Sequence, residues 1–132
     1  MTEATAMPIT ALNHVNLRTG QLQAMVHWYT HVLGLVDGPR PAFPFAGAWL
    51  YAGDTAVVHL VEVDNPHAVG SEVELKLEHF AFSATDHAAF EARLNTTGTR
   101  YKQSTLAEAG LALYNLWDPD GNHIHVDFPL DG

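Results

Sequence analysis

Apolar positions follow two different periods along the chain, and the two periods alternate. Residues 22–33 place apolar side chains at steps of three and four, which is typical of an amphipathic helix, and residues 86–97 repeat this spacing. A period of two, which is typical of strands, dominates elsewhere. The stretches with this alternation are 12–17, 56–63, 77–82 and 123–128. The order of these elements predicts an α+β protein.

The two halves of the chain repeat each other. The string Leu-x-His-apolar-x-apolar occurs around His14 and again 65 positions later around His79. Each copy is followed by a predicted helix that ends at a glycine, Gly34 or Gly98, as helices often do. Further along, residues 47–51 match residues 110–114 at a spacing of 63 positions. Each half is therefore predicted to be a βαβββ module.

The modules have predicted boundaries at 9–63 and 77–129, joined by a polar linker at 64–76. Together they are expected to form one structural domain, with the two modules in a pseudo-twofold arrangement around a cleft. The segment 37–47 contains three prolines and two phenylalanines, which predicts a stiff, partly apolar loop that could act as a lid.

Composition narrows the possible partners. The 132 residues include 15 acidic and 6 basic side chains, and this charge of −9 disfavours nucleic acids and anionic membrane surfaces. The sequence contains no apolar run long enough to span a bilayer and no signal-peptide pattern, so we expect a soluble cytoplasmic protein. Because there is no cysteine, a metal site would depend on carboxylates and on the nine histidines.

Four of these histidines fall at equivalent places in the repeat. His14 and His79 belong to the repeated string, while His59 and His125 lie 45 and 46 positions after them, in the last strand of each half. Strand alternation puts them opposite the apolar face, although His59 lies among valines that leave its face less certain. A single histidine of this kind is usually just hydrogen-bonded, but four equivalent ones favour metal ligation. His27 and His31, one helical turn apart, are expected to be solvated.

The modules resemble the vicinal oxygen chelate superfamily over about residues 9–129. The similarity lies in the two Leu-x-His strings, in the pairs Trp28-Tyr29 and Leu33-Gly34, and in the turn Asp-Pro-Asp-Gly-Asn at 118–122. The superfamily includes glyoxalase I, extradiol dioxygenases, fosfomycin-resistance enzymes and metal-free drug-binding proteins. The resemblance implies a divalent ion such as zinc, nickel, manganese or iron, with ligands at His14, His79, His125 and His59.

One position departs from the family pattern. The usual ending has glutamate where this chain has His125, and a neutral ligand leaves the ion more electrophilic. Asp127, two residues further along the same face, could then serve as the catalytic base or could orient a ligand. Candidate substrate-binding residues are Arg18, which could pair with a carboxylate, and the aromatic residues Trp49, Tyr51 and Tyr114.

Three functions are compatible with these features. The favoured one is a metal-dependent, glyoxalase-like lyase or isomerase acting on a small oxygenated substrate. An extradiol ring-cleaving dioxygenase is the second, although its iron site commonly includes a carboxylate that position 125 lacks. A metal-free protein that binds a drug-like ligand through aromatic residues is the third. In each case we expect a homodimer, because the sheets would leave edges to be covered.

Overall fold

A computed structural model describes residues 11–64 and 77–131 as two mixed four-stranded sheets. Each sheet is built by one half of the chain, with strand orders β1-β4-β3-β2 and β5-β8-β7-β6. In each, the first strand runs parallel to the last, and the others pair antiparallel. The predicted α+β class and the pair of βαβββ modules are confirmed.

The first module follows the predicted element order with small shifts at the boundaries. Its elements are β1 (Val15–Thr19), α1 (Leu22–His31), β2 (Val36–Gly38), β3 (Gly47–Ala52) and β4 (Thr55–Glu62). Helix α1 buries Met25 and Tyr29 completely, which explains the apolar stripe in its sequence. The segment 39–46 connects β2 to β3 without regular structure.

The second module repeats this order. It contains β5 (Phe80–Ser83), α2 (His87–Thr96), β6 (Tyr101–Leu106), the short 3-10 helix η2 (Ala107–Ala109), β7 (Leu111–Trp117) and β8 (His123–Pro129). The Asp86 carboxylate caps α2 by accepting a hydrogen bond from the Ala89 amide, and Leu94 is the helix residue buried in the core. Most of the predicted linker, residues 65–76, lies outside the described residues.

Strand register shows how the halves correspond. Leu50 pairs with Val58 in the first sheet, and Leu116 pairs with Ile124 in the second. All four residues are buried, and both steps between the modules are 66 positions (50 to 116, 58 to 124). The spacing of 63 that the sequence suggested for this strand is therefore wrong. The spacings of 63 and 66 differ by three residues. Because three is an odd number, the spacing of 63 would place every side chain of this strand on the opposite face of the sheet.

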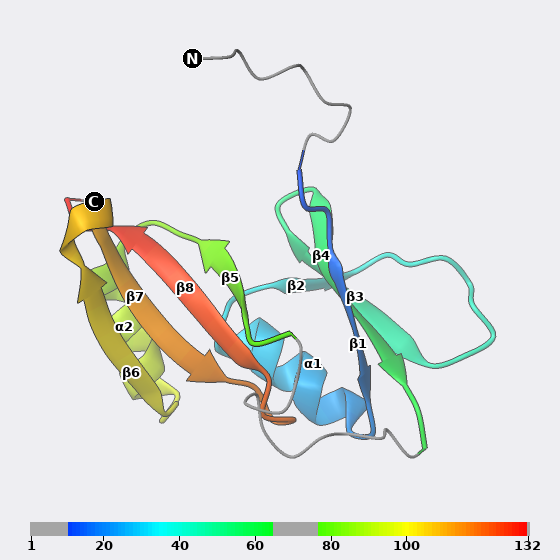
Figure 1. Ribbon diagram of the computed structural model, residues 1–132. Helices are drawn as coiled ribbons and strands as arrows, with labels where there is room; N and C mark the ends of the chain where they lie inside the picture. Colours follow the sequence, from blue (N-terminus) through cyan, green and yellow to red (C-terminus); the bar gives the residue numbers. More distant parts are fainter. Residues whose placement is uncertain (1–10, 65–76, 132) are drawn as a thin grey trace, which may run out of the picture.

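The two modules contact each other through α1 and α2. Figure 1 shows the sheets at opposite sides of the molecule, with α1 at the base of the view and α2 behind the second sheet. Arg93 of α2 donates hydrogen bonds to the carbonyls of His31 and Thr30, at the end of α1 where the helix dipole is negative. Gln21, just before α1, donates to the Asp120 carboxylate in the turn between β7 and β8. Within the described residues, no helix has the length and apolar character needed to cross a membrane.

Candidate metal centre

The face of each sheet opposite its helix carries the predicted histidines. In β4, Val58 and Leu60 face the core and are almost fully buried, so His59 between them projects to the other face. In β8, Ile124 and Val126 are buried in the same way, and His125 projects from the face that they leave. The strand alternation read from the sequence therefore holds for both histidines, including His59.

The first pair consists of His14, immediately before β1, and His59 of β4. Their rings are stacked, with centroids 3.8 Å apart and planes at 9°. Trp49 of β3 pairs with His59 across the sheet and stacks on its ring at 4.1 Å. The His59 Nε2–H donates to the Ala56 carbonyl at 3.1 Å, which leaves Nδ1 with its lone pair. Burial and the neighbouring His14 lower the pKa of His59, so the ring is neutral and can act as a ligand.

The second pair consists of His79, immediately before β5, and His125 of β8. Their rings stack at 4.0 Å with an interplanar angle of 14°, which closely repeats the first pair. Burial is the main cause that lowers the pKa of His125, and the neighbouring His79 and His123 add to the effect. Each half of the repeat therefore forms one pair of stacked imidazoles, one from the residue before its first strand and one from its last strand.

A third imidazole joins the second pair. His79, His123 and His125 each offer a ligand atom, and these atoms lie within 4.8 Å of one another. His123 was not among the ligands predicted from the sequence, although its position two residues before His125 on the same strand face was a readable signal. This cluster contains neither His14 nor His59, so the structure forms the two pairs but does not gather all four predicted ligands into one group.

The donor set fits a transition-metal ion. Imidazole nitrogens suit zinc, nickel, copper and iron, and a ligand must be deprotonated at the coordinating nitrogen. The lowered pKa of His125 satisfies this condition near neutral pH. A chain that offers three imidazoles in one cluster has the ligand number of a catalytic metal site with open positions.

Asp127 lies on the histidine side of β8. It pairs across the parallel ladder with Ser83, and its Oδ1 is buried without a hydrogen-bond partner among the described residues. A buried carboxylate oxygen of this kind is costly unless a proton, a cation or a substrate group meets it. The structure therefore keeps Asp127 available for the role predicted from the sequence, which remains a prediction.

The predicted substrate-binding residues lie in different places. Trp49 contacts His59, and Arg18 is exposed on β1. Tyr51 instead lines a cavity of about 470 Å³ between the modules, whose lining includes none of the clustered histidines, and its hydroxyl donates to the Pro39 carbonyl. Tyr114 is only 2% exposed and donates to Glu91 of α2, which corrects its expected place beside the histidines.

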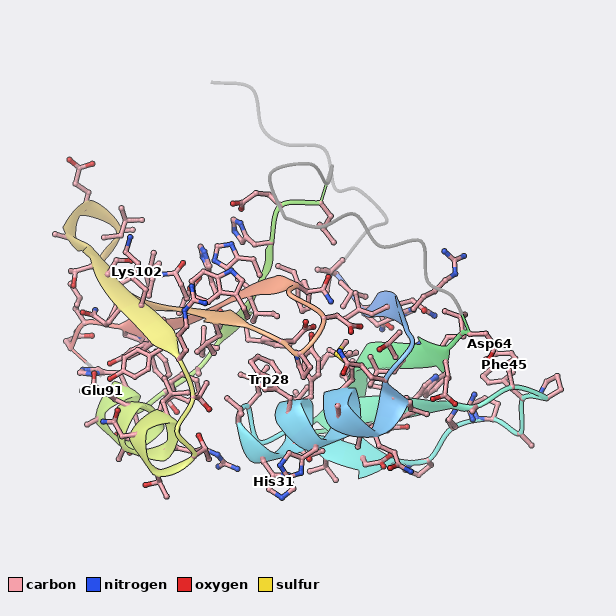
Figure 2. The ribbon with its side chains drawn as sticks, turned by 90° about the horizontal axis from the view of Figure 1, so that it is seen from below. Trp28, His31, Phe45, Asp64, Glu91 and Lys102 are labelled. Atoms are coloured by element: carbon pink, nitrogen blue, oxygen red, sulfur yellow. The ribbon has the colours of Figure 1, made fainter. Side chains whose placement is uncertain are left out.

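The loop that was predicted as a lid exposes aromatic side chains. Phe43 and Phe45 are 41% and 44% exposed, stack on each other at 5.0 Å, and carry the Arg40 guanidinium over their rings. Phe43 also lies 6.4 Å from Trp49, so the aromatic contacts continue from this loop to His59. Figure 2 shows Phe45 at the far end of the first module from Lys102 of the second.

His27 and His31 form a separate stacked pair. Their ring centroids are 3.9 Å apart on the exposed side of α1, and both residues are exposed, as expected. Figure 2 shows His31 pointing away from the side of α1 on which Trp28 lies. This pair belongs to no cluster of three ligand groups among the described residues.

Comparisons with known proteins agree with this fold. The family model of the Glyoxalase/Bleomycin resistance protein/Dioxygenase superfamily matches residues 11–126. No curated protein matches the chain in sequence at a significant level.

Solved structures resemble the chain closely in fold but weakly in sequence. A glyoxylase/bleomycin resistance protein/dioxygenase domain from Frankia sp. EAN1pec has a TM-score of 0.76 at 20% identity, over 94% of this chain and 95% of that one. A lactoylglutathione lyase from Agrobacterium tumefaciens has a TM-score of 0.69 at 22% identity, over 92% and 96%. A fosfomycin resistance protein from Listeria monocytogenes has a TM-score of 0.66 at 11% identity, over 91% and 93%. The chain belongs to the Glyoxalase/Bleomycin resistance protein/Dioxygenase superfamily.

Proposed function

We propose that this protein is a metal-dependent enzyme with glyoxalase-like lyase or isomerase chemistry on a small oxygenated substrate. The observation that carries the proposal is the repetition of a stacked imidazole pair, His14 with His59 and His79 with His125, at equivalent strands of the two modules. The proposed ligands are His14, His79 and His125, with His59 as a fourth ligand or an immediate neighbour. A divalent ion held there would act as a Lewis acid on two adjacent substrate oxygens.

The chain's own groups would handle the proton. Asp127 Oδ1, buried on the histidine side of β8, would accept a proton from the substrate carbon next to a carbonyl and return it to the neighbouring carbon. The hydroxyl proton of the substrate would also move from one of the two adjacent oxygens to the other, so that the product is an isomer of the substrate. The exposed guanidinium of Arg18 would pair with a substrate carboxylate, and Trp49 would keep the His59 ring in place.

The imidazole at position 125 favours this chemistry over ring cleavage. A carboxylate there would reduce the net charge of the bound ion, whereas a neutral ligand leaves two full positive charges for polarising oxygens. Non-haem iron sites that activate oxygen commonly include one carboxylate beside two histidines. The ring-cleaving dioxygenase is therefore the second candidate.

We also propose a homodimer. β1 and β5 are edge strands of their sheets, and the residues that precede them include Leu12 and Leu77, which are 83% and 55% exposed. Unpaired edges with exposed leucines are surfaces that proteins usually cover. Because His14 and His79 stand at the beginning of these same edge strands, a dimer that covers them would bring the two imidazole pairs toward each other.

Metal quantification followed by an assay panel tests the function. The purified protein would be analysed for transition metals and then assayed with 2-oxoaldehyde–thiol adducts, epimerisable thioesters and catechols. Metal-dependent turnover of the first or second group supports the proposal. Oxygen uptake with a catechol that depends on iron and is lost in His79→Ala would establish the dioxygenase instead. Ligand binding with neither metal nor turnover would establish the metal-free binding protein, for which the exposed Phe43 and Phe45 are the supporting observation.

A further inference from the structure

The second sheet differs from the first in the number of imidazoles that it gathers. The ring centroids of His79 and His125 lie 4.0 Å apart, those of His123 and His125 lie 4.8 Å apart, and those of His79 and His123 lie 5.4 Å apart. The first sheet has its stacked pair only, and Trp49 lies against His59 there. The two modules are therefore not equal as metal-binding units.

Hydrogen bonding fixes which nitrogen of His123 carries the lone pair. The Asn115 amide is oriented by its Nδ2, which donates to the Lys102 carbonyl at 2.9 Å. Its Oδ1 consequently faces His123 Nε2 at 3.1 Å, and because an amide oxygen only accepts, Nε2 carries the hydrogen. In the neutral ring the lone pair is then on Nδ1, the nitrogen that can coordinate an ion.

Glu78 adds a negative charge beside this nitrogen. One of its carboxylate oxygens accepts a hydrogen bond from His79 Nδ1, which leaves His79 Nε2 as the coordinating atom. The other oxygen lies 3.7 Å from His123 Nδ1. The negative charge of this carboxylate favours a cation held at His123 Nδ1.

The rings are also held in place before any ion binds. Trp117 of β7 pairs with His123 across the sheet and stacks on it at 5.1 Å with an interplanar angle of 9°. The His123 side chain is only 10% exposed, so it has little freedom to turn away. Ligands that are already oriented lose less conformational entropy on coordination.

We propose that His123 is a further ligand of the divalent transition-metal ion beside His79 and His125, with Glu78 orienting His79. The inference deepens the proposed function, on which it rests for the use of the ion in catalysis. The repeat of the two modules cannot suggest this role for His123. At the spacing of 66 positions, residue 123 corresponds to residue 57 of the first module, which is a valine.

Metal binding to full-length variants tests this assignment. Zn²⁺ affinity would be measured by competition with a chromophoric chelator, and Co²⁺ absorption would report the ligand set. His123→Gln should weaken Zn²⁺ binding by about 100-fold or more, and Glu78→Gln by about 10–100-fold, the range found when a group that orients a metal-bound histidine is removed. The double variant His14→Ala/His59→Ala removes the two imidazoles that the first module contributes to the ligand set of the proposed function, so it tests that set separately from His123.

Two controls exclude indirect effects. His27→Ala/His31→Ala removes a stacked imidazole pair from the exposed side of α1 and should leave Zn²⁺ affinity unchanged. Far-UV circular dichroism and thermal unfolding of each metal-free variant identify loss of folding. Glu78 is 59% exposed, so its substitution tests the cluster even where His123→Gln lowers stability.

The possible results separate this inference from the proposed function. Loss of the ion from His14→Ala/His59→Ala together with wild-type affinity in His123→Gln overturns the inference and leaves the ligand set of the proposed function in place. Weaker Zn²⁺ binding in His123→Gln and Glu78→Gln supports the inference, even if no substrate in the assay panel is turned over, a result that would count against the proposed function alone. Absence of Zn²⁺ binding by the wild type overturns both.

Discussion

The hydroxyl of Tyr29 in α1 donates a hydrogen bond of 2.7 Å to the carboxylate of Asp118 in the turn after β7, and both residues are buried. The contact joins the first module to the second across 89 positions of sequence. The other donors to the same carboxylate are the amides of Asp120 and Asn122 and the Asn122 side chain, which hold the turn that leads into β8. Tyr29 thus ties the first module to the turn that positions His123 and His125.

Tyr29→Phe should destabilise the protein by about 1.5–3 kcal/mol, the range for a hydrogen bond to a charged group. The phenyl ring would still fill the core, so the loss of stability measures the contribution of the hydroxyl group. Urea unfolding measures the change. Tyr101→Phe is the matched control, because its hydroxyl makes only an exposed bond of 3.3 Å to Asn95, and we expect a change within about 0.5 kcal/mol. Equal effects of the two substitutions would contradict the role of the Tyr29–Asp118 contact.

Asp118 should make stability depend on pH in the acid range. Burial raises the pKa of Asp118 above its ordinary value of 3.8, although the hydrogen bonds from Tyr29 and Asn122 oppose this. The folded state therefore holds the proton more tightly than the unfolded chain, so the contribution of Asp118 is greatest below pH 3.8 and is lost as the pH rises through the folded pKa.

Comparison with Asp118→Asn isolates this effect. The difference in unfolding free energy, wild type minus variant, should decrease as the pH rises from about 3 toward 6, since the asparagine does not titrate. Urea unfolding at each pH supplies the values. A difference that increases with pH would show that the hydrogen bonds outweigh burial at this carboxylate.

The sequence predicted the correspondence of the two modules correctly for the strands next to the four equivalent histidines. The strings around His14 and His79 gave the correct spacing of 65, and strand alternation gave the correct faces for His59 and His125. These signals are local, because alternation within one strand decides which residues share a face. The fact that the two imidazole pairs do not form one ligand cluster among the described residues was not readable in this way, since it depends on how the modules pack.

The error in the third strand has a specific physical cause. Gly47 and Gly110 were matched because each precedes a similar apolar string, but they are glycines for different reasons. A Cβ on Gly47 would lie 2.3 Å from the Leu60 carbonyl oxygen, whereas Gly110 ends the 3-10 helix η2 with a φ of +68°. Neither the close backbone contact at Gly47 nor the positive φ at Gly110 results from the repeat of the two modules. The false match aligned Tyr114 with Tyr51, and it also hid the correspondence of Trp49 with Asn115.

The corrected position of Tyr114 predicts a stability effect. Tyr114→Ala should cost about 3–5 kcal/mol, as for other large buried aromatic residues, because the ring packs against Phe90 and Phe128 in the core beside α2. Tyr114→Phe should retain most of that stability and leave any substrate KM unchanged. A raised KM in Tyr114→Phe with normal stability would return Tyr114 to the substrate-binding surface.

His59 and His125 should make the metal-free protein less stable as the pH falls. Burial lowers the pKa of both histidines from 6.5 in the folded state, so the unfolded chain takes up protons first. Their contribution to stability is present above pH 6.5 and is lost as the pH falls through the folded pKa. Chelator-treated His125→Asn and His59→Asn should each lose less stability than the wild type between about pH 6.5 and 5. Identical slopes in all three proteins would refute this.

Asp127→Asn tests the proposed proton transfer. The buried Oδ1 has no hydrogen-bond partner among the described residues, so the substitution breaks no hydrogen bond of that atom. An asparagine keeps the shape but cannot accept the proton, and loss of a general base typically lowers kcat by about 10²–10⁴-fold. Zn²⁺ content should be unchanged, because Asp127 is not among the residues of the histidine cluster.

Asp54→Asn is the control, because Asp54 is an exposed carboxylate between β3 and β4, and it should leave kcat unaltered. If Asp127→Asn kept wild-type kcat with normal metal content, another group would have to move the proton. If it lost the ion together with activity, Asp127 would act on the metal site instead.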